Sequence, residues 1–176
     1  MTQTERAWLA ALIDGEGSVI VDVSDRDRGR REFSISLRPS VVICNKDKRI
    51  LDKVKRITGC GRITGTTRPK YGLFWDWRVR GMWDTPKILA QVHKYLIIKK
   101  AKAKVVMRLK EYHSKLLSKP LVYDSGPRKR LANRDTYFLL KFLDKHWFKL
   151  VDKGSVSEAK TKKLISRIEQ YNSSPP

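Results

Sequence analysis

The stretch of sequence that decides the fold is Leu9-Ala10-Ala11-Leu12-Ile13-Asp14-Gly15-Glu16-Gly17. It ends a predicted helix that begins at the capping box Thr2-Gln3-Thr4-Glu5 and runs to about Gly15. Large apolar residues cover one side of this helix and small residues with one acid cover the other: Trp8, Leu9, Leu12 and Ile13, then Ala7, Ala10, Ala11 and Asp14. Polar side chains are nearly absent, so we expect both sides to be buried, one on the chain's own sheet and one against a second helix.

Four segments after this helix alternate apolar and polar residues, as strands with one buried face do. They cover residues 19–24, 33–40, 62–68 and 73–80, and a predicted helix over residues 47–58 separates the two pairs. Further helices are predicted over residues 85–96, 100–117, 135–145 and 156–171, with a basic loop over residues 119–133. The pattern predicts an α+β fold in the order αββαββα, with an antiparallel sheet and extra C-terminal helices. We expect one domain over residues 1–176, with a core at about 4–118 and a helical extension at about 119–176.

The charge of the chain indicates a polyanionic partner. Lys and Arg number 39 against 18 Asp and Glu, which gives a formal net charge of +21 on 176 residues. Such an excess repels itself in a compact state, and phosphate contacts by Lys and Arg supply most non-specific affinity for nucleic acids. Hydrophobic residues make up 40% of the chain and include five Trp, which favours a packed core over a disordered basic tail.

Several other classes of protein do not fit the composition. No apolar run approaches the ~20 residues of a membrane span, and the N-terminal residues lack the pattern of a secretory signal. The two cysteines, Cys44 and Cys60, are too few for a disulfide framework, and with three scattered histidines they match no zinc-ligand spacing. We therefore expect no membrane partner and an intracellular location, in an organelle (chloroplast or mitochondrion) or in archaeal or bacterial cytoplasm.

The nonapeptide at residues 9–17 resembles the motif that gives the LAGLIDADG homing-endonuclease family its name. It departs from that motif at Ala11, Gly15 and Glu16, and each departure keeps the small or acidic character of the position. The order strand, turn, strand, helix after the motif also resembles the family's repeat, and the resemblance covers about residues 4–118. It implies a sheet saddle that binds double-stranded DNA and an intron-encoded enzyme that hydrolyses one phosphodiester on each strand, leaving 3′ overhangs.

The resemblance also implies roles for individual residues. Glu16, with the Gly15 carbonyl, is expected to bind Mg²⁺, whose preference for hard oxygen ligands fits a carboxylate. We expect Mn²⁺ to substitute for Mg²⁺, and Ca²⁺ to bind without supporting cleavage. Asn45 is expected to hold the water network around the metal, and Lys99 and Arg49 to lie near the scissile phosphate.

A single copy of the motif predicts a homodimer. One acid in each chain does not easily cut two strands, and the small side of the first helix needs a partner. We therefore expect Ala7, Ala10, Ala11 and Asp14 at an interface between two copies, and a long, partly palindromic DNA site.

Polar residues that point outward from the strands are the candidates for DNA contact, because a pair of strands fits the major groove. They are Asp22, Ser24, Arg26 and Arg28; Ser36, Arg38 and Ser40; Arg62, Thr64, Thr66 and Arg68; and Asp76, Arg78 and Arg80.

Less specific interpretations stand beside these. The nonapeptide could end an ordinary buried helix, Asn45 could lie beside a helix N-cap, and Lys99 could belong to a solvated basic face. The functional alternatives are a maturase that binds host intron RNA and a DNA-binding regulator that does not cleave. The intact acid Glu16 favours the nuclease.

Overall fold

The computed structural model describes residues 1–27, 33–69, 72–117, 133–150 and 156–173. They form two compact units, one of Met1–Val21 with Arg38–Met107 and the other of Asp22–Leu37 with Arg108–Pro176. The second half of β1 and the beginning of β2 thus group with the C-terminal helices, and the single domain expected over residues 1–176 stays a prediction.

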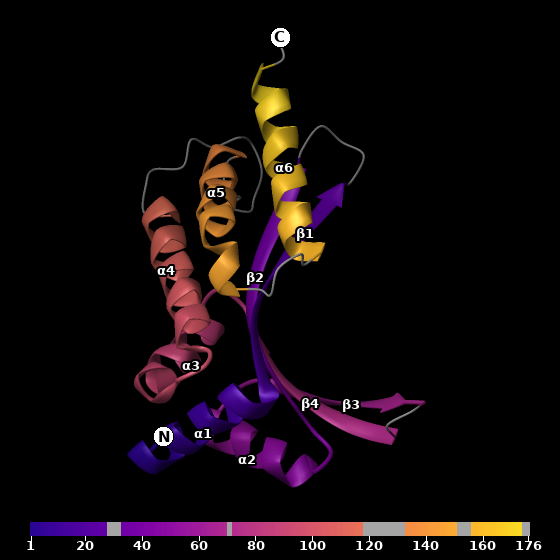
Figure 1. The fold of residues 1–176 in the computed structure, drawn as a ribbon, viewed down its shortest axis with the longest axis vertical. Helices are drawn as coiled ribbons and strands as arrows, with labels where there is room; N and C mark the ends of the chain where they lie inside the picture. Colours follow the sequence, from indigo (N-terminus) through magenta and orange to yellow (C-terminus); the bar gives the residue numbers. More distant parts are fainter. Residues whose placement is uncertain (28–32, 70–71, 118–132, 151–155, 174–176) are drawn as a thin grey trace. The chain divides into compact units, whose positions relative to one another are not determined.

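The observed elements follow the predicted α+β order αββαββα, which confirms the fold class (Figure 1). They are α1 (Gln3–Glu16), β1 (Gly17–Asp27), β2 (Phe33–Asn45), α2 (Lys48–Thr58), β3 (Arg62–Arg68), β4 (Gly72–Arg80), α3 (Asp84–Val92), the 3₁₀ turn η1 (His93–Tyr95), α4 (Lys100–Leu117), α5 (Asn133–Leu150) and α6 (Val156–Ser173). The helix predicted over residues 85–96 is shorter, because η1 takes over its last turn.

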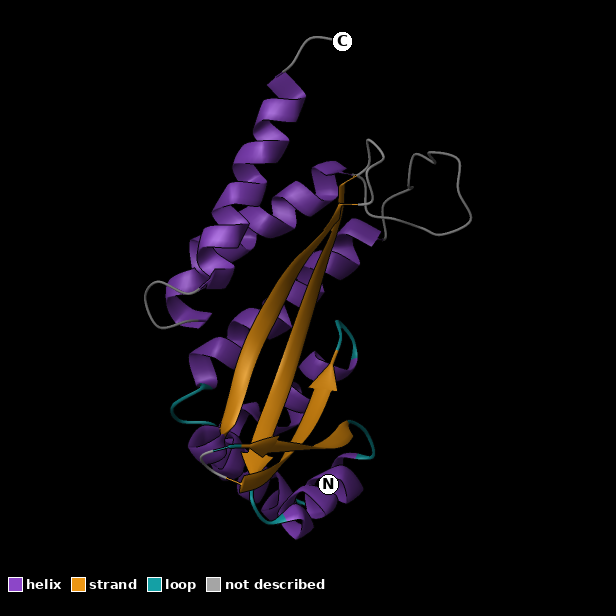
Figure 2. Cartoon of the chain, turned by 90° about the vertical axis from the view of Figure 1, so that its right-hand side faces the viewer, coloured by secondary structure: helices purple, strands orange, loops and turns teal. Residues whose placement is uncertain are grey.

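The strands form one sheet in the order β1-β2-β4-β3 (Figure 2). β4 pairs antiparallel with β2 on one side and with β3 on the other. Trp77 and Val79 of β4 are buried while Arg78 and Arg80 are exposed, as the alternation in the sequence predicts. One face of β4 therefore belongs to the core and the other is polar.

Helix α1 begins at the predicted capping box. The Thr2 hydroxyl accepts a hydrogen bond from the Glu5 amide at 3.2 Å, and the Glu5 carboxylate accepts one from the Thr2 amide at 2.8 Å. The helix ends against Gly17, where an added Cβ would lie 2.8 Å from the Ile13 carbonyl oxygen. Glycine at this position lets β1 leave the helix directly.

The turn between β4 and α3 is bonded to Pro39. The Pro39 carbonyl accepts a hydrogen bond from the Gly81 amide at 2.9 Å and another from the buried Thr85 hydroxyl at 3.0 Å. Because proline has no amide hydrogen, Pro39 contributes only as an acceptor, and it does so just before β2 begins its pairing with β4.

The second unit contains helices α5 and α6, which pack against each other. Leu139, Leu140 and Leu143 of α5 are buried in this unit. At the surface, Glu169 of α6 accepts a hydrogen bond from the Tyr137 hydroxyl at 2.8 Å and pairs with Lys141 at 3.0 Å. The C-terminal extension thus has apolar packing of its own. Within the described part of the chain, no helix has the length and apolar character needed to cross a bilayer.

Trp77 offers a test of the core of the first unit. Its indole nitrogen donates to the Cys60 carbonyl at 3.0 Å, and Gly61 (φ 86°) lies so close that an added Cβ would sit 2.6 Å from Trp77 Cε2. We expect Gly61→Ala to lower the free energy of unfolding by about 2–4 kcal/mol, from backbone strain and overpacking together. Urea unfolding followed by tryptophan fluorescence measures this loss.

Gly59 is the matched control. It has a φ of 67°, and an added Cβ would meet nothing within 4 Å. Gly59→Ala should therefore cost only the conformational part, about 1–2 kcal/mol. Equal losses in the two variants would contradict the tight packing of Gly61 on Trp77.

Candidate functional site

Asp14 connects the last turn of α1 to the segment before α4. Its carboxylate accepts hydrogen bonds from the amides of Ile97 (2.6 Å), Ile98 (3.3 Å) and Lys99 (2.8 Å). The backbone hydrogen bonds of α4 begin at Lys99, because the Lys99 carbonyl accepts a hydrogen bond from the Ala103 amide at 2.9 Å. Asp14 was expected at a dimer interface, but its carboxylate is used within the chain, where it satisfies amides at the beginning of a helix.

Lys99 reaches back to the same turn of α1. Its amine donates to the Asp14 carbonyl oxygen at 2.5 Å, which places a cation one residue from Gly15 and two from Glu16. Partial burial lowers the pKa of the Lys99 amine; the Asp14 carboxylate opposes this shift and Lys102 adds to it. Lys99 is therefore a positioned, half-buried amine and does not belong to a solvated basic face.

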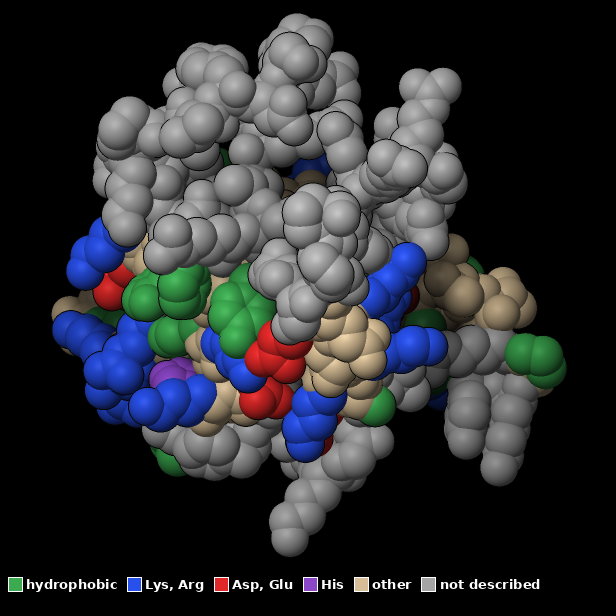
Figure 3. Space-filling view, turned by 90° about the horizontal axis from the view of Figure 1, so that it is seen from above, with side chains coloured by type: hydrophobic (Ala, Val, Ile, Leu, Met, Phe, Trp, Pro, Cys, Tyr) green, Lys and Arg blue, Asp and Glu red, His purple; other side chains and the backbone are tan. Residues whose placement is uncertain are grey.

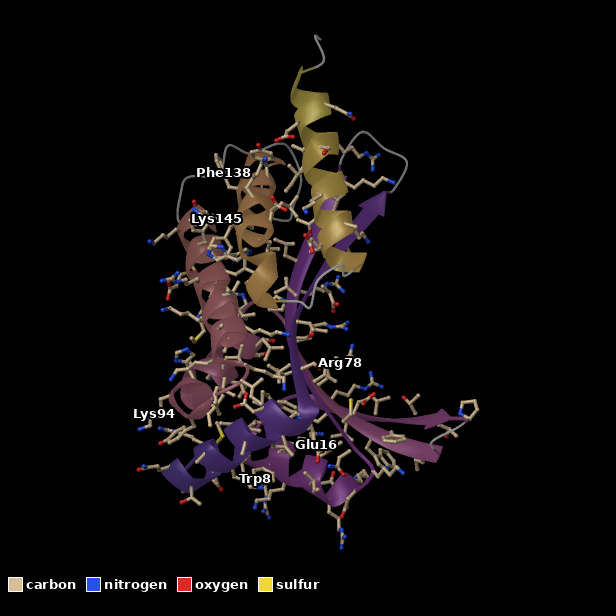
Figure 4. The ribbon with its side chains drawn as sticks, in the orientation of Figure 1. Trp8, Glu16, Arg78, Lys94, Phe138 and Lys145 are labelled. Atoms are coloured by element: carbon tan, nitrogen blue, oxygen red, sulfur yellow. The ribbon has the colours of Figure 1, made fainter. Side chains whose placement is uncertain are left out.

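Glu16 and Asn45 meet at the ends of α1 and β2. The Asn45 side-chain amide donates to Glu16 Oε2, and Asn45 Oδ1 accepts from the Asp47 amide at 2.8 Å. These two bonds fix which end of the Asn45 amide faces Glu16. The Glu16 side chain is exposed (labelled in Figure 4). Asn45 thus lies beside the N-cap residue of α2, as one of its two interpretations expected, and it also bonds to the acid; its expected role in a water network around the metal stays a prediction.

Arg49 joins this group through Asp47. Asp47 caps α2 by accepting from the Arg49 amide at 2.9 Å, and its carboxylate binds the Arg49 guanidinium at 2.6–3.0 Å. The hydrogen bonds from Arg49 lower the pKa of the Asp47 carboxyl and raise the pKa of Arg49. Hydrogen bonds therefore run from Glu16 through Asn45 and Asp47 to Arg49, and Asp47 is a member that the sequence reasoning did not include.

The donor set at Glu16 can be tested against the expected metal. Glu16 Oε1 carries no hydrogen bond to another described residue, and Gly15 is exposed beside it. Among the described residues, no three His, Cys, Asp or Glu side chains gather as a complete ligand set. An incomplete oxygen set fits Mg²⁺, which keeps several waters and shares substrate phosphates, and it does not fit a closed zinc site.

The small side of α1 differs in part from its prediction. Ala10 is fully buried (0% exposed) within its own unit, so its expected place at an interface between copies is wrong. Ala10 is buried together with Leu9 and Ile13. The buried face of α1 is therefore rotated around the helix axis, by about one residue, from the face that the sequence predicted. Ala11 and Gly15 are exposed and Ala7 is half-buried, so the uncovered face of the helix includes these small residues.

Two large hydrophobic residues beside this face are exposed. Ile97 is 85% exposed and Ile98 is 73% exposed, although both follow the buried Leu96. In the sequence the run of residues 95–98 resembles core, so nothing in the pattern distinguishes these two isoleucines. Only the backbone position set by Asp14 turns them outward.

The polar face of β3 and β4 contains five of the predicted contact residues in exposed positions: Arg62, Thr64, Thr66, Arg78 and Arg80. Asp76 on the same face is half-buried. Ser40 is the exception, because it is 0% exposed and its hydroxyl finds no hydrogen-bond partner within the described ranges. The expectation that Ser40 faces outward is therefore wrong. Ser40 lies where β2 pairs with the end of β4, next to Pro39, which is hydrogen-bonded to the turn before α3.

The remaining contact candidates lie on or near the first hairpin, except Arg68, which ends β3. Asp22, Ser24 and Arg38 are half-buried. The side chains of Arg26, Ser36 and Arg68, and the whole of Arg28, lie outside the described residues. Surface charge has the sign that the composition indicates: on the face drawn in Figure 3, Lys and Arg show at several places and Asp and Glu at fewer.

Residues 9–113 match the family model described as LAGLIDADG endonuclease, which is more than half of the chain. The chain belongs to the LAGLIDADG endonuclease family. Among curated protein sequences, none is similar enough to count as a match.

Solved structures share this fold at low sequence identity. The homing endonuclease I-CvuI in complex with its target is 18% identical, with a TM-score of 0.67 over 95% of this chain and 96% of that chain. The archaeal intron-encoded homing endonuclease I-Vdi141I complexed with DNA is 17% identical, with a TM-score of 0.70 over 96% and 97%. The LAGLIDADG meganuclease I-CpaMI bound to uncleaved DNA is 14% identical, with a TM-score of 0.65 over 97% of this chain and only 51% of that chain.

The bonds of Asp14 predict a large effect of its replacement. We expect Asp14→Ala to lower the free energy of unfolding by about 2 kcal/mol, because three amides lose a charged acceptor. Asp14→Asn should lose less, because its amide oxygen can still accept from Ile97 and Ile98 while its amide nitrogen cannot accept from Lys99. Asp52→Ala removes a surface carboxylate paired with Lys48 at 2.9 Å and should cost about 0.5 kcal/mol or less. Chemical denaturation compares the three; an Asp14→Ala variant as stable as Asp52→Ala would contradict the anchoring role.

Proposed function

We propose that this protein is a homodimeric, site-specific DNA endonuclease. It binds a long, partly palindromic double-stranded site and hydrolyses one phosphodiester on each strand with a divalent metal ion, leaving 3′ overhangs. The observation that carries the proposal is the Glu16–Asn45 pair at the end of the motif helix, near the Lys99 amine that is held at the Asp14 carbonyl. The membership of the chain in the LAGLIDADG endonuclease family supports it.

Glu16 and the Gly15 carbonyl are the residues that would hold Mg²⁺ or Mn²⁺, and Ca²⁺ would bind without cleavage. When bound, the ion supplies the charge that activates water and stabilises the leaving oxygen of the phosphodiester. Asn45 keeps one oxygen of Glu16 occupied, so the carboxylate presents its other oxygen in a fixed direction. I-CvuI has been solved with DNA in the presence of Ca and in the presence of Mg, which agrees with the use of divalent ions on this fold.

Lys99 is the cation that this chain places near the reacting phosphate. Its amine is held at the Asp14 carbonyl, one residue before Gly15, so it can donate to a phosphate oxygen as negative charge develops. Arg49 lies further along the same hydrogen-bonded series and is suited to a neighbouring phosphate, since its guanidinium is exposed.

A second copy of the chain completes the site. One chain supplies one acid at the metal position, and the exposed Ala11, Gly15, Ile97 and Ile98 leave an apolar face beside that acid. The lengths of the related structures agree with this pairing. The alignment covers nearly all of I-CvuI but about half of I-CpaMI, as expected if the longer chain holds two such folds. The retained acid supports a nuclease over a non-cleaving regulator, and no contact among the described residues specifically favours intron RNA.

Replacement of Glu16 tests the catalytic assignment. We expect Glu16→Gln to reduce cleavage by more than about a hundredfold while DNA binding remains, because losing a metal ligand exceeds the ~10–100-fold effect of losing a residue that only orients one. Asn45→Ala should fall within that smaller range. Cleavage of a target selected from a randomised library, with Mg²⁺ and with a chelator, gives both rates.

Glu111→Gln is the matched control, since Glu111 is an exposed acid on α4. It should leave cleavage unchanged. Full activity of Glu16→Gln, or wild-type cleavage in the presence of the chelator, would remove Glu16 and the metal from the proposal.

The proposed pairing has its own test. We expect Ala11→Glu to be monomeric at micromolar concentration, because a charge placed on the small face prevents close approach of two helices. Ala90→Glu makes the same change at an exposed position of α3 and should remain dimeric. Sedimentation velocity distinguishes the two. A dimeric Ala11→Glu that still cuts both strands would show that α1 does not form the interface.

A further inference from the structure

Arg62 and Arg78 face each other on the polar side of the sheet. They are direct partners in the register of β3 and β4, so their side chains leave the same face of the sheet. Cβ atoms of direct partners lie only ~4.5–5.5 Å apart, and like charges in such a pair are destabilising. Both arginines are exposed, and neither makes an ion pair with another described residue. The free protein therefore holds two guanidinium groups together, and neither is ion-paired within the part of the chain that the structure describes.

The next row of the same face contains an acid. Asp76 is the direct partner of Thr64 in β3 and of Cys44 in β2, two residues along β4 from Arg78. Its Oδ1 is buried and accepts no hydrogen bond from any residue that the structure describes. A carboxylate at this place would be repelled by phosphates if this part of the sheet followed the DNA backbone. It can instead accept a hydrogen bond from the amino group of a base in the major groove.

The opposite face of β4 cannot serve the same purpose. Trp77 is buried there and Trp75 carries the Lys48 amine at 5.6 Å from its ring centroid, so α2 covers this side. Arg78, labelled in Figure 4, leaves β4 on the uncovered side. The arginine pair and Asp76 thus form one recognition surface of three side chains on adjacent rows.

We propose that Arg62 and Arg78 are specificity-determining residues that bind the major-groove edges of guanine in two adjacent G·C base pairs of each half-site. Each guanidinium donates two hydrogen bonds to O6 and N7 of one guanine. Neighbouring base pairs are stacked ~3.4 Å apart, which two side chains that start ~5 Å apart can reach if their ends converge slightly. Asp76 accepts from the amino group of a cytosine or adenine at the next position. The inference rests on the proposed function as a DNA-binding enzyme and assigns part of its target.

The test is selection of DNA from a randomised double-stranded pool, with Ca²⁺ present, by the wild type and by Arg62→Ala and Arg78→Ala. The wild-type site should contain two adjacent G·C pairs in each half. Each alanine variant should lose preference at one of them, by about tenfold to a hundredfold against other base pairs, and keep the remaining positions. Because the like charges are relieved, neither variant should have a lower melting temperature in the absence of DNA.

Two controls separate base recognition from phosphate contact. Arg78→Lys keeps the charge but loses the planar fork, so it should lose the guanine preference as Arg78→Ala does. Lys55→Ala and Arg56→Ala remove the same charge from exposed positions of α2, on the covered side of the sheet, and should leave the selected sequence unchanged.

The outcomes are distinct. A selected site without adjacent G·C pairs would overturn the assignment while DNA recognition stands. Variants that weaken binding to all sequences alike, with a smaller salt dependence and an unchanged site, would also overturn it, because they would show phosphate contacts. If the wild type enriches no sequence at all, the proposed DNA-binding function fails and this assignment fails with it.

Discussion

The hydrogen bonds of the Asp14 carboxylate determine where the candidate catalytic groups lie. They join the end of α1 to three consecutive amides that are more than 80 residues away in the chain. Because α4 begins at the same point, the Lys99 amine returns to the carbonyl of Asp14 and becomes a neighbour of Gly15 and Glu16. One acid of the motif is therefore structural and the other is available for chemistry, although they stand only two residues apart.

The other side of the site is fixed by the beginning of α2. The N-cap residue Asp47 bonds to Asn45 through its amide and to Arg49 through its carboxylate, so the cap of a helix also orients the Glu16 carboxylate. The hydrogen bonds of a helix N-cap thus also hold the side chain that orients the candidate catalytic carboxylate. The charged groups of the site lie where one element ends and the next begins, and not within the strands.

Much of this arrangement could be predicted from the sequence. The alternation of Trp77 and Arg78 gives the faces of β4, and the nonapeptide gives the end of α1 and the position of Glu16. The burial of Ala10 could not be predicted, because a small residue next to a large apolar stripe fits either side of it. Ser40 also continues the series of alternate positions that the sequence predicts to be exposed. Its burial is explained by the hydrogen bonds of the neighbouring Pro39 carbonyl, which hold the turn before α3 beside it. The contacts of Asp14 depend on the tertiary fold and leave no local pattern.

Ile97 and Ile98 have a consequence for how the protein exists in solution. Their amides are held by Asp14, so the two side chains cannot turn inward without breaking the bonds that position Lys99. An isolated chain must leave them in water, and covering an isoleucine contributes about 1.5–3 kcal/mol. If two copies pair over this surface, folding and assembly become one equilibrium, and the thermal stability of the protein depends on its concentration. A diluted sample would then lose its active form by dissociation before any helix or strand unfolds.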